Sequence, residues 1–322
     1  MATAEQIKSL IKSHFNNDNE KFYTVALQLI AHEANKGNTL LAHSLREIID
    51  NHKTKNSSRN INLLKNINDL VIKFKSEISK KELVINETLQ NHINLIIKEY
   101  KQRAKLNLYG LTNRNKIMLV GPPGTGKTMT AKVLSYELKL PLYIIQGDKL
   151  ITKYLGESSA KLRQIFDLIE EEKGIYLFDE FDAIGGERSS DNDVGEMRRV
   201  LNSFLQYIEY ISSDSIIITA TNHPNLLDKA LFRRFDDILY YDYPSDEEIK
   251  KIILNNLNGF KPLKIDWKQI LNKAQSLSHA EIVSACKDAV KKSILENQQR
   301  VTSKNILEML NKRINTYRGI NN

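Results

Sequence analysis

Eight residues near the middle of the chain, GPPGTGKT at positions 121–128, restrict its fold more than any other feature. They match the pattern G-x-x-x-x-G-K-[ST] and lie between a short apolar run at 117–120 and a stretch with helical periodicity at 129–138. In such a loop the glycines let the backbone N–H groups point inward, and the following helix adds the positive end of its dipole. The sequence therefore predicts a loop that binds phosphate groups.

The residues of this loop have expected roles in binding a nucleoside triphosphate such as ATP. Lys127 should reach the β- and γ-phosphates, and the hydroxyl of Thr128 should bind Mg²⁺. The other residues expected to line the nucleotide are Gly121, Pro122, Pro123, Gly124, Thr125, Gly126 and Met129. A glycine turn with an incidental lysine is the alternative, and the predicted strand and helix on either side argue against it.

Two acidic residues follow the apolar run IYLF at 175–178. Asp179 should emerge at the carboxyl end of a buried strand, which is where open α/β sheets bind their ligands. We expect Asp179 to help bind Mg²⁺ and Glu180 to orient or deprotonate the attacking water. Two solvated acids after a strand are the alternative, but the phosphate loop upstream favours a catalytic pair.

Strands and helices alternate on both sides of the acidic pair. Apolar runs and helical periodicity predict strands at 117–120, 141–146, 175–178 and 216–220, and helices at 129–138, 159–172 and 194–211. This alternation is typical of a parallel sheet covered by helices on both faces. We therefore expect an α/β fold of the P-loop NTPase type, an αβα core at residues 85–243, followed by a helical C-terminal domain at 244–322.

Helix-breaking residues are scarce before the phosphate loop, with no proline and only Gly37 and Gly110 as glycines. Apolar residues recur at helical spacing in three stretches of residues 1–56, which predicts an all-helical N-terminal domain. We expect this bundle to recognise a substrate, an adaptor or another partner. Residues 57–84 should form a linker with a helix, and a longer helix should run from 89 to 104. The apolar positions of the linker are Leu64, Ile67, Val71 and Phe74.

An amide and two arginines follow the last predicted strand. Asn222 comes directly after the apolar run IIITAT and could donate to a γ-phosphate and position the attacking water. Arg233 and Arg234 stand together in LFRRFD at 231–236, where two guanidinium groups could act as arginine fingers on a neighbouring subunit's nucleotide. Taken alone, such a pair is more often plain surface charge.

These parts, in this order, resemble the AAA family of ATPases. The matching residues are GPPGTGKT at 121–128, FDEFD at 178–182 and TATNHPNLLDKALFRRFD at 219–236. The resemblance implies hydrolysis of ATP with Mg²⁺ at a subunit interface of a homo-oligomer, a ring hexamer, in which Arg233 and Arg234 act in trans. The compact RRF is similar to the katanin and Vps4-like branch and leaves open which arginine is the main finger.

The same resemblance assigns two regions around the base of the nucleotide. The helical domain at 244–322 would be the family's lid. Within it, SHAEI at 278–282 resembles the SGAD element near the adenine, with His279 in place of the glycine and Glu281 in place of the aspartate. Residues 83–85 would supply the other side of the base pocket.

A pore loop is also implied by resemblance. KYLGE at 153–157 resembles the first pore loop of the family, in which Lys153, Tyr154 and Leu155 would grip an extended polypeptide. Residues 187–195 would then form a second mobile loop facing the channel. A buried tyrosine after a strand is the alternative reading of Tyr154.

Composition bears on location and partners. A single cysteine, Cys286, excludes a disulfide within the chain and lies in an apolar helical stripe, so a core position in a cytoplasmic protein is expected. No apolar run reaches the roughly 18–20 residues that span a bilayer, so no membrane partner is expected.

The net charge is +8, and residues 1–106 carry 17 Lys and Arg against 11 Asp and Glu. That excess could favour nucleic acid or an acidic protein, and an ordinary solvated surface is the interpretation we prefer.

Taken together, the sequence predicts an ATP-hydrolysing motor that remodels, unfolds or translocates a protein substrate through a ring pore. Similar small stand-alone bacterial ATPases can occur beside a subtilisin-like protease, so a separate serine protease is a candidate partner. The alternative is a nucleic-acid-associated ATPase in defence or plasmid maintenance, which would use the basic N-terminal region.

Overall fold

The computed structural model describes residues 4–15, 19–38, 41–47, 69–151, 156–185, 191–260, 262 and 264–318 of the 322-residue chain. Contacts divide the chain into two compact units, Met1–Asn66 and Ile67–Asn322. None of the described helices is both long and apolar enough to cross a bilayer.

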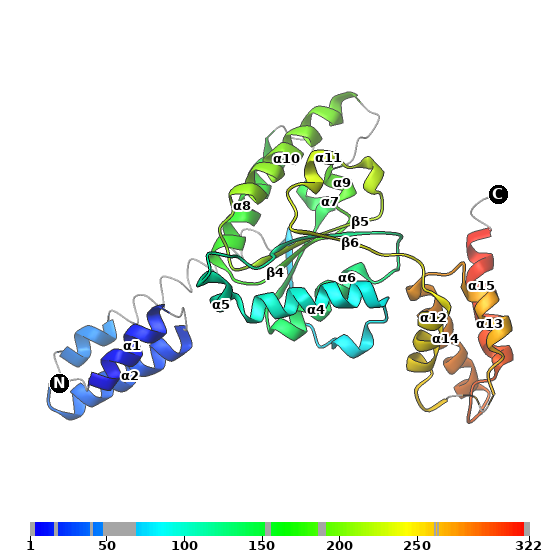
Figure 1. Cartoon of the computed structure of the whole chain (residues 1–322), viewed down its shortest axis with the longest axis horizontal. Helices are drawn as coiled ribbons and strands as arrows, with labels where there is room; N and C mark the ends of the chain where they lie inside the picture. Colours follow the sequence, from blue (N-terminus) through cyan, green and yellow to red (C-terminus); the bar gives the residue numbers. More distant parts are fainter. Residues whose placement is uncertain are drawn as a thin grey trace. The chain divides into compact units, whose positions relative to one another are not determined.

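The first unit is helical over its described residues (Figure 1). Helix α1 (Ala4–Phe15) packs against α2 (Asn19–Asn35), and residues 41–47 are helical as well. Ala26 and Ile30 of α2 are buried, so the apolar stripe of this helix supplies part of a small core. After α2 the chain turns at Gly37, whose φ of +86° is the left-handed conformation that commonly ends a helix.

The second unit is built on a six-stranded sheet in the order β1-β3-β4-β5-β2-β6 (Figure 1). All neighbouring strands are parallel except β1 and β3, which pair antiparallel. The strands are β1 (Val71–Phe74), β2 (Lys116–Val120), β3 (Leu142–Ile145), β4 (Ile175–Phe178), β5 (Ile216–Thr221) and β6 (Asp237–Tyr240). The α/β fold with a mainly parallel sheet, predicted from the alternation of strands and helices, is confirmed.

Helices cover both faces of this sheet, with α4 and α6 on one face and α8 and α10 on the other (Figure 1). Strands β4 and β5 are buried along their whole length, which explains their continuous apolar sequences. The helices and short helical turns of the sheet region are η1 (Lys80–Glu82), α4 (Glu87–Lys101), α5 (Arg103–Asn107), α6 (Lys127–Leu138), α7 (Gly147–Leu150), α8 (Glu157–Glu171), α9 (Asp182–Gly185), α10 (Asp191–Tyr210), η2 (Pro224–Leu226) and α11 (Lys229–Phe232).

An aromatic cluster fastens α8 and α10 to the sheet. Phe204 of α10 is fully buried, and its ring centroid lies 5.6 Å from that of Phe166, 5.2 Å from Phe178 and 4.6 Å from Phe181. Phe181 lies just after the two acids that follow β4, so packing in this cluster fixes the direction of the chain after them.

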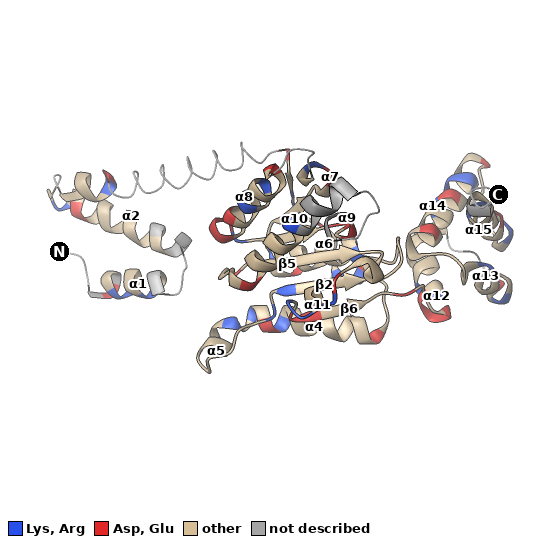
Figure 2. Cartoon of the chain, turned by 90° about the horizontal axis from the view of Figure 1, so that it is seen from above, with Lys and Arg blue, Asp and Glu red and all other residues tan. Residues whose placement is uncertain are grey.

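The C-terminal part of the second unit is entirely helical in its described residues. It contains α12 (Asp246–Asn256), η3 (Asn258–Phe260), α13 (Trp267–Ala274), α14 (His279–Leu295) and α15 (Ser303–Arg318). Ser245 and Ser278 begin α12 and α14 with capping boxes, which explains why these helices start where they do. Cys286 is fully buried and burial raises its pKa to about 12, so the predicted core position is confirmed. Acidic and basic side chains are interspersed along α8 and α14 (Figure 2).

Three local predictions are corrected by the structure. Val71 and Phe74, read as part of a helical linker, lie on strand β1, because pairing with β3 outweighs their helical spacing. The helix expected to reach 104 ends at Lys101, since Gln102 leaves the helical conformation at φ −105° and ψ 16°. Strand β6, with only four residues, was not expected at all. Leu64 and Ile67 lie outside the described residues.

Candidate active site

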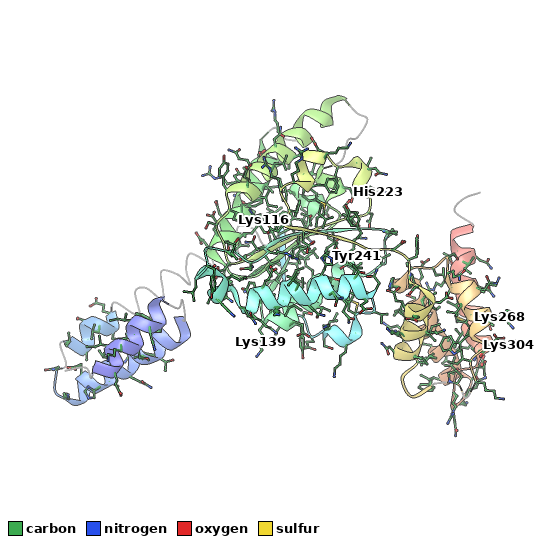
Figure 3. The ribbon with its side chains drawn as sticks, viewed as in Figure 1. Lys116, Lys139, His223, Tyr241, Lys268 and Lys304 are labelled. Atoms are coloured by element: carbon green, nitrogen blue, oxygen red, sulfur yellow. The ribbon has the colours of Figure 1, made fainter. Side chains whose placement is uncertain are left out.

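The phosphate loop connects β2 to α6, as predicted, and close backbone contacts fix its shape. A Cβ atom at Gly121 would lie 2.3 Å from the carbonyl oxygen of Tyr241, and one at Gly124 would lie 2.6 Å from the hydroxyl of Ser278. Gly124 also has a φ of +75°, which other residues rarely adopt. Glycine is therefore required at both positions, and the loop lies against β6 on one side and the start of α14 on the other. Tyr241 is labelled in Figure 3.

Lys127 is buried inside the loop, at the N-terminal end of α6. Its ammonium donates hydrogen bonds of 2.7 Å to the carbonyl oxygens of Gly121 and Pro122. Burial lowers the pKa of Lys127, while the carboxylates of Asp179 and Asp182 act in the opposite direction. A buried ammonium enclosed by the glycine-rich loop and attracted by two carboxylates fits a triphosphate bound with a metal ion.

The two predicted metal-binding side chains meet. The hydroxyl of Thr128 donates a hydrogen bond of 2.7 Å to Oδ2 of Asp179, and the Glu180 backbone N–H donates to Oδ1 of the same carboxylate at 3.0 Å. A hydroxyl and a carboxylate side by side are oxygen ligands of the kind that Mg²⁺ prefers, so this pair fits the ion.

Glu180 has an unusual backbone conformation. Its φ is +50°, which costs a non-glycine residue free energy and is found most often at functional positions. Its side chain is exposed, and together with Asp179 it lines a hollow of about 560 Å³ that also includes Gln146. An exposed carboxylate beside the metal-binding pair is accessible to water, as a general base must be.

Asp182 was not among the predicted site residues, yet it connects the ends of two strands. Its Oδ1 accepts a hydrogen bond of 3.0 Å from the Thr221 hydroxyl and one of 3.2 Å from the Asn222 backbone N–H. These bonds bring half-buried Asn222, at the end of β5, next to the acidic segment that follows β4. The sequence offered one signal, the second aspartate of FDEFD, but the partners of Asp182 become visible only in the folded sheet.

Arg233 is the C-cap of the short helix α11, Arg234 follows it, and both are exposed. Nη1 of Arg234 lies 3.0 Å from Oε1 of Glu209 on α10. Arg233 takes part in no ion pair within the described part of the chain. The structure therefore distinguishes the two arginines, one held by a carboxylate and one free to reach a partner.

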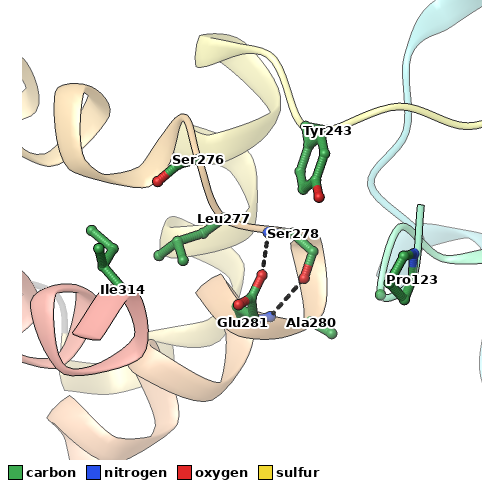
Figure 4. Close-up of a pocket in the computed structure, with 9 residues that line it drawn as sticks. Pro123, Tyr243, Ser276, Leu277, Ser278, Ala280, Glu281 and Ile314 are labelled. Carbon is green, nitrogen blue, oxygen red and sulfur yellow. Dashed lines mark hydrogen bonds between the residues drawn. The ribbon is translucent and has the colours of Figure 1, made fainter. Parts of the chain in front are cut away.

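The start of α14 contacts the phosphate loop directly. The N–H of Ala280 donates to the Gly124 carbonyl oxygen at 3.0 Å, and a cavity of about 490 Å³ opens beside this contact (Figure 4). Glu281 accepts a hydrogen bond of 2.6 Å from the Ser278 N–H, so its carboxylate caps its own helix. Both ring nitrogens of His279 are buried without a partner among the described residues, and burial lowers the pKa of this imidazole.

The remaining predicted residues divide into two groups. Pro123 and Gly124 line the cavity shown in Figure 4, and Met129 is partly buried against the core beneath the sheet. Lys153, Tyr154 and Leu155, which were predicted to form a pore loop, lie outside the described residues, as do residues 187–190 of the second loop. Residues 191–195, also predicted to belong to that loop, instead form the first turn of helix α10.

A parallel sheet that ends in a glycine-rich phosphate loop, with an acidic pair on the next strand but one, defines a P-loop nucleoside triphosphatase. The family described as "ATPase family associated with various cellular activities (AAA)" matches residues 117–243. The chain is 32% identical over 309 residues to "Uncharacterized AAA family ATPase y4kL" of Sinorhizobium fredii, covering 94% of this chain and 92% of that one. The chain belongs to the AAA family, and it binds and hydrolyses ATP.

Two further relatives have more specific names. The "Putative 26S proteasome regulatory subunit homolog" of Methanothermobacter thermautotrophicus is 30% identical over 266 residues, which cover 81% of this chain and 70% of that protein. The "Peroxisomal ATPase pex6" of Schizosaccharomyces pombe is 34% identical over 230 residues, 67% of this chain but only 23% of that protein. The second likeness therefore concerns a small part of a much longer protein.

The contact between Gly124 and the start of α14 can be tested with Gly124→Ala. We expect the Kd for ATP to rise by about tenfold, because the new methyl group pushes Ser278 away from the loop. Gly110→Ala is a matched control, since Gly110 has a similar φ of +70° but open space around it. Equal Kd values in the two variants, measured by titration with a fluorescent ATP analogue, would contradict a role for this contact.

The two hydrogen bonds of Asp182 predict a loss of turnover without a loss of binding. Asp182→Ala should lower kcat by about 10²-fold, because Asn222 loses the hydrogen bond that holds it next to the acidic segment after β4, and should change the Kd for ATP little. Asp182→Asn keeps one acceptor oxygen, so its kcat should fall less than that of Asp182→Ala. Steady-state phosphate release and ATP titration measure the two effects, and an equal loss in kcat and affinity would point to general misfolding instead.

Proposed function

We propose that this ATPase works as a ring-shaped motor that remodels, unfolds or translocates protein substrates. The observation that carries the proposal is the exposed Arg233 on α11, which is free of ion pairs in the described residues and so available to a neighbouring subunit's nucleotide. Support also comes from the names of two relatives, a proteasome regulatory subunit homolog and a peroxisomal ATPase. The name of the first, a regulatory subunit homolog of the proteasome, fits a chain that acts on other proteins.

ATP hydrolysis in this proposal uses residues from three strand ends. Lys127 and the loop amides would bind the β- and γ-phosphates. Thr128 and Asp179 would hold Mg²⁺, which would supply positive charge against the phosphate oxygens. Glu180 accepts the proton of the attacking water. Asn222, held by Asp182, aligns that water with the γ-phosphate.

The arginines act in trans. Charge builds on the transferring phosphoryl group, and guanidinium groups from the next subunit would stabilise it, an effect worth roughly 10³–10⁵ in rate. We assign the main role to Arg233, because Arg234 is already held by Glu209. Arg234 would then position the end of α11.

The other parts of the chain would connect hydrolysis to work on a protein. Residues 85–243, together with strand β1, would form the ATPase core, and residues 244–322 a lid that changes position with the nucleotide. The part of 57–84 that precedes β1 would join this core to an N-terminal helical domain at 1–56 that selects a substrate or adaptor. In a hexamer, Lys153, Tyr154 and Leu155 of each subunit would grip an extended polypeptide in the central pore. A separate serine protease could receive the unfolded polypeptide.

A nucleic-acid-linked ATPase is the second candidate, because residues 1–106 carry an excess of basic side chains. Binding of labelled DNA or RNA that weakens steeply with salt would favour it. Absence of binding at low salt would remove it.

The trans arrangement predicts that two inactive variants restore each other. Glu180→Gln should bind ATP but lose hydrolysis by about 10²–10⁴-fold, and Arg233→Ala should lose about 10³-fold or more. Mixed in equal amounts, they should regain activity, because some interfaces join an intact Glu180 to an intact Arg233. Phosphate release from the mixed oligomers is the measurement.

Two controls accompany this experiment. Lys229→Ala removes another exposed cation from α11 and should leave the rate unchanged. Arg234→Ala should lose less activity than Arg233→Ala. A mixture as inactive as its components, or a chain that stays monomeric with ATP, would exclude the ring mechanism.

The pore role of Tyr154 predicts that Tyr154→Ala keeps ATPase activity but loses the ability to unfold a fluorescent protein with an unstructured tail. Tyr154→Phe keeps the aromatic side chain and should retain most of the unfolding activity. Loss of fluorescence over time, with ATP, is the measurement. Unfolding that survives in Tyr154→Ala would show that another part of the chain engages the substrate.

A further inference from the structure

A third hollow, of about 770 Å³, lies at the outer edge of the sheet beside β1, and we call it the edge pocket. Its lining includes Lys73, Phe74, Lys75, Lys101, Tyr136 and Lys139. Pro141, which precedes β3, also lines the edge pocket. The pocket therefore lies where β3 begins, whereas the hollow that contains Glu180 lies where β3 ends. Lys139 is labelled in Figure 3.

Strand β1 has one edge that no described strand covers. It pairs only with β3, and it ends the sheet. The Gln146 N–H donates to the Leu70 carbonyl oxygen, so Leu70 and Gln146 form a hydrogen-bonded pair. Such pairs alternate along an antiparallel ladder, so the backbone N–H and C=O groups of Ile72 and Phe74 also point toward β3. The backbone groups of Val71 and Lys73 therefore point away from β3, where they can pair with an added strand.

The two sides of β1 differ in character. Ile72 is 46% exposed and Phe74 39% exposed, and they share one side, toward α6, where the Lys132 ammonium lies 5.3 Å from the Phe74 ring centroid. The side chain of Lys73 lies on the opposite face of β1, over the ring of Tyr143. Because side chains alternate along a strand, Lys75 follows Lys73 on that face. Exposed apolar residues on an open edge strand are a hazard for aggregation, so a binding partner that covers them would be favourable.

Charge indicates what kind of partner fits. The edge pocket has four lysines against two acids, Glu77 and Glu137. Among the described residues Lys75, Lys101 and Lys139 make no ion pair. The chain's own segment at 51–68 carries three lysines and one arginine without any acid, so like charge disfavours it as the occupant.

We propose that the edge pocket binds an acidic, extended segment of another protein, which adds to the sheet as a strand beside β1. Its backbone would pair with Val71 and Lys73, its apolar side chains would cover Ile72 and Phe74, and its carboxylates would face the lysines. This site is separate from ATP binding and does not depend on the motor proposal.

The test uses the full chain and a fluorescein-labelled ten-residue peptide in which Val and Glu alternate, with a Val and Lys peptide as its counterpart. Fluorescence anisotropy should show saturable binding of the Val and Glu peptide that weakens with salt. Lys75→Glu and Lys139→Glu should each weaken it by about fivefold. Lys268→Glu, an exposed lysine on α13 labelled in Figure 3, should leave it unchanged.

Backbone pairing has its own variant. Lys73→Pro removes an N–H that points away from β3, so it should abolish binding while Lys73→Ala, which removes only the charge, weakens it. ATPase activity should be unchanged in all these variants, which shows that they are folded. Absence of saturable binding, equal affinity for the Val and Lys peptide, equal effects of Lys73→Pro and Lys73→Ala, or tighter binding of labelled single-stranded DNA through the same lysines would overturn the proposal.

Discussion

The hydrogen bond between the Thr128 hydroxyl and the Asp179 carboxylate is the contact on which the rest of the site depends. It joins the loop after β2 to the end of β4, although β5 lies between these strands in the sheet. Asp182 makes the second connection, to Thr221 at the end of β5. Three segments far apart in the sequence are thus held together at the carboxyl ends of the parallel strands. Glu180 lies between the two connections, in a backbone conformation that costs of order 1–3 kcal/mol and that only such surroundings can maintain.

The sequence is sufficient to predict those parts of the site in which local spacing determines the chemistry. Glycines, a lysine and a hydroxyl within eight residues specify both the loop and its ligand, and four apolar residues before Asp179 specify a buried strand. Asp182 could not be predicted, because its partners reach it only after β4 and β5 pair. Glu281 was expected by resemblance to lie near the adenine; it lines the cavity beside Gly124, and its carboxylate also caps α14, a role that its spacing from Ser278 allows but that the resemblance did not suggest. Strand β1 was misread because Val71 and Phe74 are three residues apart, a spacing that a helix also allows.

Strand polarity places the two functional regions apart. The carboxyl ends of the parallel strands carry the phosphate loop, the acids and Asn222, whereas the edge pocket lies where β3 begins. Strand β3 extends from one region to the other, because Pro141 lines the edge pocket and Gln146 lines the hollow that contains Glu180. A segment bound along β1 would therefore add hydrogen bonds to the strand pair next to the hollow that contains Glu180, without occupying the nucleotide's place.

The hydrogen bond from the Ala280 N–H to the Gly124 carbonyl has a mechanical consequence. It attaches the first turn of α14 to the loop that is predicted to bind the phosphates, so a shift of that loop would be passed to the helix. Helix α14 has 17 residues and is about 26 Å long. A tilt of about 5° at its first turn would displace its last turn by about 2 Å, given a rigid helix. The helix can thus act as a lever that converts a small change at the nucleotide into a larger displacement at its far end.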